Sequence, residues 1–168
     1  MYQNVQGHFS FQPPTGWKEI STEKLKEFNQ DKPIPFDFGF QKGDPYPYFL
    51  GQIRFNRKVS KNNVETYIAH ATPVENLTDI AENIKDGSYL NRDLYYTKHQ
   101  FFIMIAEYDD TQPILSFMAK KYSSYGYVII HYYLSSPRSP EELVDSLKNL
   151  SKILDTFEYD QEYKFTGE

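Results

Sequence analysis

Hydrophobic and polar positions alternate most clearly in the second half of the chain. Four runs rich in aromatic and β-branched residues occupy residues 94–98, 100–108, 113–122 and 127–134, and short polar segments separate them. Such runs are typical of β-strands, and short connections make neighbouring strands antiparallel. The pattern therefore predicts a four-stranded antiparallel meander.

Apolar residues also alternate in three earlier segments, which predict shorter strands at residues 8–11, 36–40 and 49–56. The first of these strands stops before Pro13 and Pro14, because proline lacks the N–H group that a strand ladder uses. The segment Asp31–Tyr48 is rich in proline and is expected to run partly as loops. The prediction is an antiparallel sheet of about six to seven strands.

Two helices are predicted where apolar residues recur at three- and four-residue spacing behind a serine that can cap the first turn. Ser21 precedes a brief helix that presents Leu25 and Phe28. Ser139 opens the capping box Ser-Pro-Glu-Glu and a longer final helix. Its inward positions are Leu143, Leu147, Leu150 and Leu154.

The helical pattern around Pro73 has two interpretations. Asn62 and Glu65 form a capping pattern for a helix with the apolar positions Val64, Tyr67, Ile68 and Ala71. Thr72-Pro73-Val74-Glu75 is a second capping box with proline at the first helical position, which predicts another helix ending at Gly87. Its inward positions are Leu77, Ile80, Ala81 and Ile84. The alternative is one helix kinked at Pro73.

Turn positions in the meander predict which side chains share a face. A turn at Tyr125-Gly126 places Lys120 opposite His131, and a turn across residues 109–112 places Tyr108 opposite Pro113. One face is then apolar throughout and is the predicted core: Phe102, Met104, Ala106, Leu115, Phe117, Ala119, Val128, Ile130, Tyr132 and Leu134. The other face, called the mixed face below, carries Phe101, Ile103, Ile105, Glu107, Ser116, Met118, Lys120, Tyr122, Tyr127, Ile129, His131 and Tyr133.

The mixed face is too apolar for contact with water alone and too polar to be sealed entirely by helices. One interpretation is that a helix or loop of the same chain covers its apolar half, while Lys120 and His131 reach the rim. The other is a recognition surface, because aromatic and methionine side chains are favoured in interfaces. The predicted partner-binding residues are Met118, Lys120, Tyr122, Tyr127, Ile129, His131 and Tyr133.

Length and charge narrow the classes of function. The 168 residues are expected to form a single domain over residues 1–168, and 39% of them are hydrophobic, which excludes a disordered chain. The formal net charge of −5 argues against nucleic-acid binding, which requires a basic surface.

No apolar run is long enough for an integral membrane segment, and no charged-then-apolar signal segment opens the chain. We expect a cytoplasmic protein, with an exported or periplasmic protein that has lost its signal segment as the alternative.

Motifs for catalysis and metal binding are missing from the sequence. There are no cysteines, the four histidines His8, His70, His99 and His131 are scattered, and there is neither a phosphate-binding glycine loop nor a Gly-x-Ser-x-Gly elbow. The best catalytic candidate is His131 with Lys120 and Glu107. We therefore expect no catalytic residues, no metal and no cofactor.

The order of these segments resembles the fold family of the photosystem extrinsic protein PsbP, the nuclear-import factor Mog and bacterial DcrB-like proteins. The resemblance is carried by residues 9–17, Phe-Ser-Phe-Gln-Pro-Pro-Thr-Gly-Trp, then by the central helix, the aromatic meander and a final helix ending in Leu154-Asp155-Thr156-Phe157. It implies an antiparallel sheet layered between helices in an α/β/α sandwich. It also implies a binding adaptor, since members include small bacterial secretion chaperones that hold apolar client segments. The segment Asp31–Tyr48 is longer than in the usual pattern of the family.

Together these observations predict an α+β domain that acts as a noncatalytic protein-binding module or chaperone-like adaptor. The partner would be a protein client or a second copy of the chain. The alternatives are a carrier of a small apolar ligand or lipid that uses the same face, and an unrecognised hydrolase. An open groove favours the protein client, while a closed apolar cavity favours the small ligand.

Overall fold

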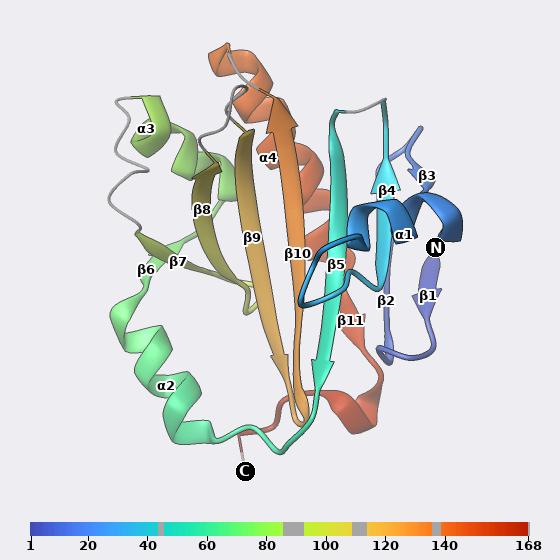
Figure 1. Cartoon of the computed structure of the whole chain (residues 1–168). Coiled ribbons are helices and arrows are strands. Elements are labelled where there is room, and N and C mark those ends of the chain that lie inside the picture. The colour runs from blue at the N-terminus through green and yellow to red at the C-terminus, as the bar shows by residue number, and fades with distance from the viewer. Residues whose placement is uncertain (44–45, 86–92, 109–113, 136–138, 168) are drawn as a thin grey trace.

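An eight-stranded sheet forms the centre of the molecule (Figure 1). The computed structural model describes residues 1–43, 46–85, 93–108, 114–135 and 139–167. The strands lie in the order β3 (Lys18–Glu19), β4 (Phe38–Gln41), β5 (Tyr48–Phe55), β10 (Gly126–Ser135), β9 (Ile114–Ser123), β8 (Phe102–Tyr108), β7 (Leu94–Thr97) and β6 (Thr72–Val74). Neighbouring strands are antiparallel except β6 and β7, which are parallel. The predicted meander is confirmed as β7–β10.

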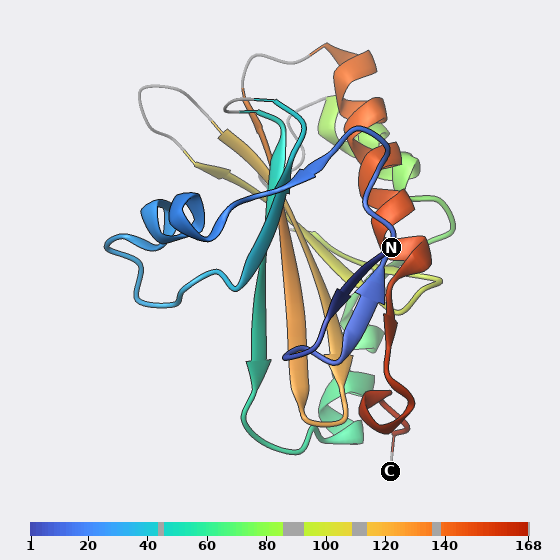
Figure 2. The same cartoon turned by 90° about the vertical axis from the view of Figure 1, so that its right-hand side faces the viewer.

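Different elements stand on the two faces of this sheet (Figure 2). One face carries the long helix α4 (Pro140–Thr156) and a three-stranded sheet of β1 (Tyr2–Asn4), β2 (Phe9–Phe11) and β11 (Glu158–Tyr159). The short helix α1 (Thr22–Asn29) stands on the opposite face. The remaining elements are α2 (Lys61–His70), the 3₁₀ turn η1 (Leu77–Asp79), α3 (Ile80–Lys85) and the 3₁₀ turn η3 (Gln161–Tyr163). The α+β class is thus confirmed, with strands in two sheets.

The main core lies between the large sheet and α4. Ser139 begins α4 as predicted, because its hydroxyl accepts a hydrogen bond from the Glu142 amide, and Leu143, Leu147, Leu150 and Leu154 are buried. Aromatic rings of the small sheet extend this core, with the Phe9 and Phe157 centroids 4.8 Å apart. Phe117, Ile130 and Tyr132 have no exposed surface, which confirms their predicted place in the core.

The last hairpin turns one residue earlier than predicted. Its loop is Ser124-Tyr125, so Lys120 pairs with Ile129, and His131 pairs with Met118 instead of Lys120. The C-terminal segment holds this loop, since the Ser124 amide donates to the Tyr163 carbonyl and its hydroxyl donates to the Lys164 carbonyl. The pairing moves by two residues, and because side chains alternate with a period of two, every residue of β9 and β10 keeps its predicted face.

The pairing of β8 differs from the prediction by one residue, which reverses its faces. Tyr108 lies opposite Ile114 rather than Pro113, and Ile103 lies opposite the buried Ala119. Ile103 and Ile105 therefore belong to the core, whereas Phe102, Met104 and Ala106 were wrongly assigned to it and lie on the mixed face. Phe101, just before the strand, was also assigned to the mixed face and is buried in the main core.

Two separate helices lie on either side of Pro73, as the first interpretation predicted, but the second, α3, begins at Ile80 after the turn η1 and not at Pro73. Residues 72–74 form β6, which pairs with β7, and the capping box is made by Asn76 and Asp79 rather than Thr72 and Glu75. Proline is tolerated in an edge strand, so pairing with β7 prevails over the local helix signal. Helix α2 begins behind Ser60 rather than Asn62, while Leu77, Ile80 and Ala81 are buried as predicted. The side chain of Ile84 and residue Gly87 lie outside the described residues.

Candidate functional site

The seven predicted partner-binding residues share one face of β9 and β10. The register places them in cross-strand rows: Met118 opposite His131, Lys120 opposite Ile129, and Tyr122 opposite Tyr127. Tyr133 completes the set and pairs with Ser116 and Tyr48. All seven are partly buried, so each side chain contacts other protein groups and also keeps some surface exposed to solvent.

The segment Asp31–Tyr48 and helix α1 cover one end of the mixed face. Phe36 packs edge-on against His131, with 5.6 Å between the ring centroids, and Tyr48 stacks on Tyr133 at 4.9 Å. Phe28 of α1 lies 5.1 Å from Tyr48. A hydrogen bond joins this cover to β5, because the Gln52 side-chain Nε2 donates to the Ile34 carbonyl at 3.1 Å. The chain therefore covers part of this face, but not as expected: Phe36 covers His131, which was predicted at the rim, while the apolar Met104 remains 41% exposed.

His131 is held in a neutral state beneath this cover. Its Nε2 lies 3.1 Å from Gln52 Oε1, an acceptor, so Nε2 carries the proton. Burial lowers the pKa of His131 to about 4. Among the described residues, no group hydrogen-bonds its buried Nδ1. The charged imidazolium is therefore disfavoured near neutral pH.

A cluster of aromatic side chains surrounds Lys120 at the opposite end of the mixed face. Lys120 Nζ lies 4.0 Å from the centroid of the Tyr127 ring and 5.1 Å from that of Tyr122. Tyr67 of α2 stacks on Tyr122, and Phe102 meets both tyrosines edge-on. Burial raises the pKa of Tyr122 to about 12, with further contributions from Tyr67 and Tyr127, and burial lowers the pKa of Lys120. The ammonium is thus part of an aromatic cluster.

Between the two covered ends lies a strip of Met104, Met118 and Ile129, called the methionine strip below. Met104 and Met118 are directly opposite each other on β8 and β9, in the same row as His131 of β10, and Ile129 lies in the next row, opposite Lys120. Met104 is 41% exposed, whereas the adjacent Ile105, on the core face, is 6% exposed. Sequence reasoning missed Met104 because the slip of one residue assigned it to the core. The strip is the apolar part of the face that α1 and α2 leave partly open.

Two of the predicted catalytic candidates, Lys120 and His131, have other partners in the structure. Lys120 faces Tyr127, His131 is bonded to Gln52, and each pairs with an apolar residue across the strands. Glu107 pairs with Leu115 in the register, and its side chain lies outside the described residues. Within the described ranges, no three histidine, aspartate or glutamate side chains gather closely enough to hold a metal ion.

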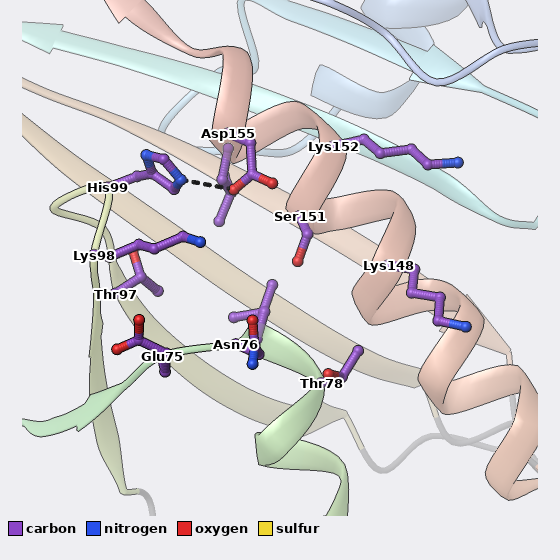
Figure 3. Close-up of a pocket in the computed structure, with 12 residues that line it drawn as sticks. Glu75, Asn76, Thr78, Thr97, Lys98, His99, Lys148, Ser151, Lys152 and Asp155 are labelled. Atoms are coloured by element: carbon purple, nitrogen blue, oxygen red, sulfur yellow. Dashed lines mark ion pairs between the residues drawn. The ribbon is translucent and has the colours of Figure 1, made fainter.

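A separate polar cavity of about 350 Å³ lies beside His99, between the β7–β8 turn, residues 75–78 and α4 (Figure 3). His99 Nε2 lies 3.0 Å from Asp155 Oδ1, and the His99 carbonyl accepts a hydrogen bond from Lys121 Nζ. Sequence reasoning saw His99 only as an isolated histidine. The available signal was a polar stripe on the last helix, Lys148, Ser151, Lys152 and Asp155, at positions i, i+3, i+4 and i+7.

Comparisons with known proteins inform the fold alone. No family model and no curated protein matches the chain. A crystal structure of a protein from Bacteroides thetaiotaomicron is similar, with a TM-score of 0.51, 12% sequence identity and coverage of 92% of this chain. The match covers 46% of that protein, so this chain spans less than half its length. In the part of the chain that is described, no helix has the length and apolarity needed to cross a membrane.

Proposed function

We propose that this chain is a noncatalytic protein-binding module whose mixed face receives an apolar segment of a partner protein. The observation that carries the proposal is the methionine strip, which leaves Met104 41% exposed between two covered ends. Apolar patches on soluble proteins often mark contact sites, and methionine adapts to partners of different shape.

The neighbours of the strip favour a protein segment over a small ligand. Met104 is 41% exposed, and Met118 and Ile129 are half-buried, so the strip lies at the surface of the sheet. A small apolar ligand or lipid would be expected in a more enclosed site. Lys120 and the tyrosines beside the strip can add cation–π and hydrogen-bond contacts at one end of a bound segment.

A noncatalytic role also agrees with the state of His131. A general base near neutral pH needs a pKa close to the working pH and an accessible nitrogen. His131 has a pKa of about 4, and its Nε2 is bonded to Gln52. These features support a structural role for His131 rather than a role as the general base of a hydrolase.

The test is selection of peptides from a random phage-displayed library on the full chain, followed by calorimetry with the enriched synthetic peptides. Met104→Glu is the test variant, because a carboxylate within an apolar contact costs binding energy. Val5→Glu is the matched control, since Val5 is also apolar and is 78% exposed in a different region. Thermal unfolding of both variants checks that the fold is retained.

We expect peptides with apolar side chains to bind the wild-type chain and Val5→Glu equally, and to lose affinity for Met104→Glu. Equal affinity for all three proteins, or a library that yields no binding peptide, would contradict the proposal. Sedimentation of the wild-type chain across a concentration series shows whether a second copy occupies the strip. Self-association that Met104→Glu abolishes would identify the chain itself as the partner protein.

A further inference from the structure

We propose that the cavity beside His99 binds a small polyanion that carries phosphate or carboxylate groups. This site is distinct from the mixed face and lies on the α4 side of the sheet (Figures 2 and 3). Its volume of about 350 Å³ suits a small molecule, and polar side chains from three separate segments form its walls.

The charges that line the cavity leave an excess of cations. Lys98, Lys148 and Lys152 contribute ammonium groups, and among the described residues none of the three lies within 4.0 Å of a carboxylate. The lining also holds two carboxylates, Glu75 and Asp155, and Asp155 Oδ1 lies 3.0 Å from His99 Nε2, so three lysines face two carboxylates and the formal charge of the lining without His99 is +1. A local cationic site stands out in a chain whose formal net charge is −5.

Neutral hydrogen-bond donors are positioned among these cations. Figure 3 shows the Lys98 ammonium and the Ser151 hydroxyl directed toward one another across the cavity, with Asn76 and Thr78 along its lower side. The Asn76 side chain accepts a hydrogen bond from the Asp79 amide in the capping box, which fixes its position at the edge of the cavity. Thr97 Oγ1 accepts from the Phe101 amide, so its hydroxyl proton is available. An anion between these groups would meet donors from several sides.

The placement of the lysines indicates a ligand with more than one anionic group. Lys98 comes from the β7–β8 turn, whereas Lys148 and Lys152 extend from the rim on α4, away from His99 (Figure 3). Lysine ammonium groups are flexible point charges that donate hydrogen bonds to phosphate and to carboxylate groups alike. The rim lysines also raise the local concentration of anions near the cavity.

Calorimetry of the full chain with pyrophosphate and with citrate, at low ionic strength, tests the site and separates phosphate from carboxylate ligands. Lys98→Gln removes the inward ammonium, and Ser151→Ala removes the opposing hydroxyl. Lys18→Gln is the matched control, because Lys18 is an exposed lysine on β3 outside the cavity and its loss changes the net charge equally. Amide chemical shifts of Asn76, His99 and Ser151 report whether the probe enters the cavity.

We expect at least one probe to bind, with shift changes at Asn76, His99 and Ser151. Lys98→Gln should weaken that binding by about tenfold or more, as for loss of one charge-assisted hydrogen bond. Ser151→Ala should weaken it less, and Lys18→Gln should leave it unchanged. The probe that binds more tightly identifies the preferred anionic group. Absence of binding by both probes, or an equal effect of Lys18→Gln and Lys98→Gln, would overturn the proposal, since the second result indicates attraction by overall charge alone.

Discussion

The two faces of the central sheet are built from alternate residues of the same strands, yet they are closed in different ways. On the core face, Phe117, Ile130 and Tyr132 belong to one continuous cluster with α4 and the small sheet. On the mixed face, the Asp31–Tyr48 segment covers one end, Tyr67 of α2 borders the other, and the methionine strip lies between them. The comparison teaches that burial on one face supplies stability, while partial cover on the other leaves side chains available for contact.

Truncation of the core face should give the largest effect. Phe117→Ala is expected to lower the free energy of unfolding by about 3 to 5 kcal/mol, because a fully buried ring is replaced by a cavity. Denaturant titration measures the loss. Ile129→Ala is the comparison on the mixed face, where partial exposure predicts a smaller cost. A loss below about 1 kcal/mol for Phe117→Ala would show that this face is not the main core.

The cover over His131 should make stability depend on pH. The pKa of His131 falls from 6.5 to about 4 on folding, so below pH 6.5 the unfolded chain binds a proton that the folded chain does not. Stability attributable to this group is therefore complete above pH 6.5 and is lost as the pH falls toward 4, by up to about 3 kcal/mol.

Urea unfolding of the wild-type chain and of His131→Gln, at neutral pH and near pH 4, isolates this contribution. The other titrating groups are common to both proteins, so they cancel in the difference. The wild-type chain should lose more stability than the variant over this range. Parallel pH profiles would indicate that the segment Asp31–Tyr48 does not bury His131 in solution.

The helices α4 and α2 differ in their N-terminal caps. Removing the cap of α4 should lower the free energy of unfolding by less than the changes at Phe117 or His131. Ser139 Oγ accepts the Glu142 amide at the start of α4, whereas Ser60 makes no side-chain capping bond at the start of α2. Ser139→Ala should lower the free energy of unfolding by about 1 kcal/mol, as is typical for a lost cap. Ser60→Ala is the matched control and should cost clearly less. Thermal unfolding compares the two, and equal losses would contradict the difference in capping.

The smallest change is expected at Met104. Because its side chain is 41% exposed on the mixed face, Met104→Glu should change the free energy of unfolding by no more than about 0.5 kcal/mol. Ile105→Glu, one residue later, would bury a carboxylate in the core and should unfold or severely destabilise the chain. Circular dichroism melts of this pair test the β8 register directly, since the reverse order would restore the register expected from sequence alone.

Local signals predicted much of this fold. Ser21 and Ser139 cap their helices as their sequence patterns indicate, and the strand pattern of the meander was read correctly. The predicted faces of β9 and β10 are also correct, although the hairpin turn was predicted one residue too late. The resulting register error is two residues, which preserves side-chain alternation. The seven mixed-face residues were therefore grouped correctly, although their exact partners across the strands were not.

Features that depend on distant contacts could not be predicted. The pairing of Tyr108 with Ile114 rather than Pro113 reversed β8, because sequence spacing alone did not fix the register. Residues 72–74 became a strand only because β7 offers a partner. The cavity beside His99 depends on α4 reaching the β7–β8 turn, which neither segment encodes by itself.

The two edge strands of the large sheet offer little surface for pairing with another chain. Its longest strands, β9 and β10, are rich in aromatic and β-branched residues and occupy central positions. The outermost strands are β3, two charged residues, and β6, three residues with Pro73 at the middle. Short, charged or proline-containing edges offer few main-chain groups to an added strand, which hinders the stacking of chains into amyloid. The sheet can thus expose an apolar strip on its face while resisting growth at its edges.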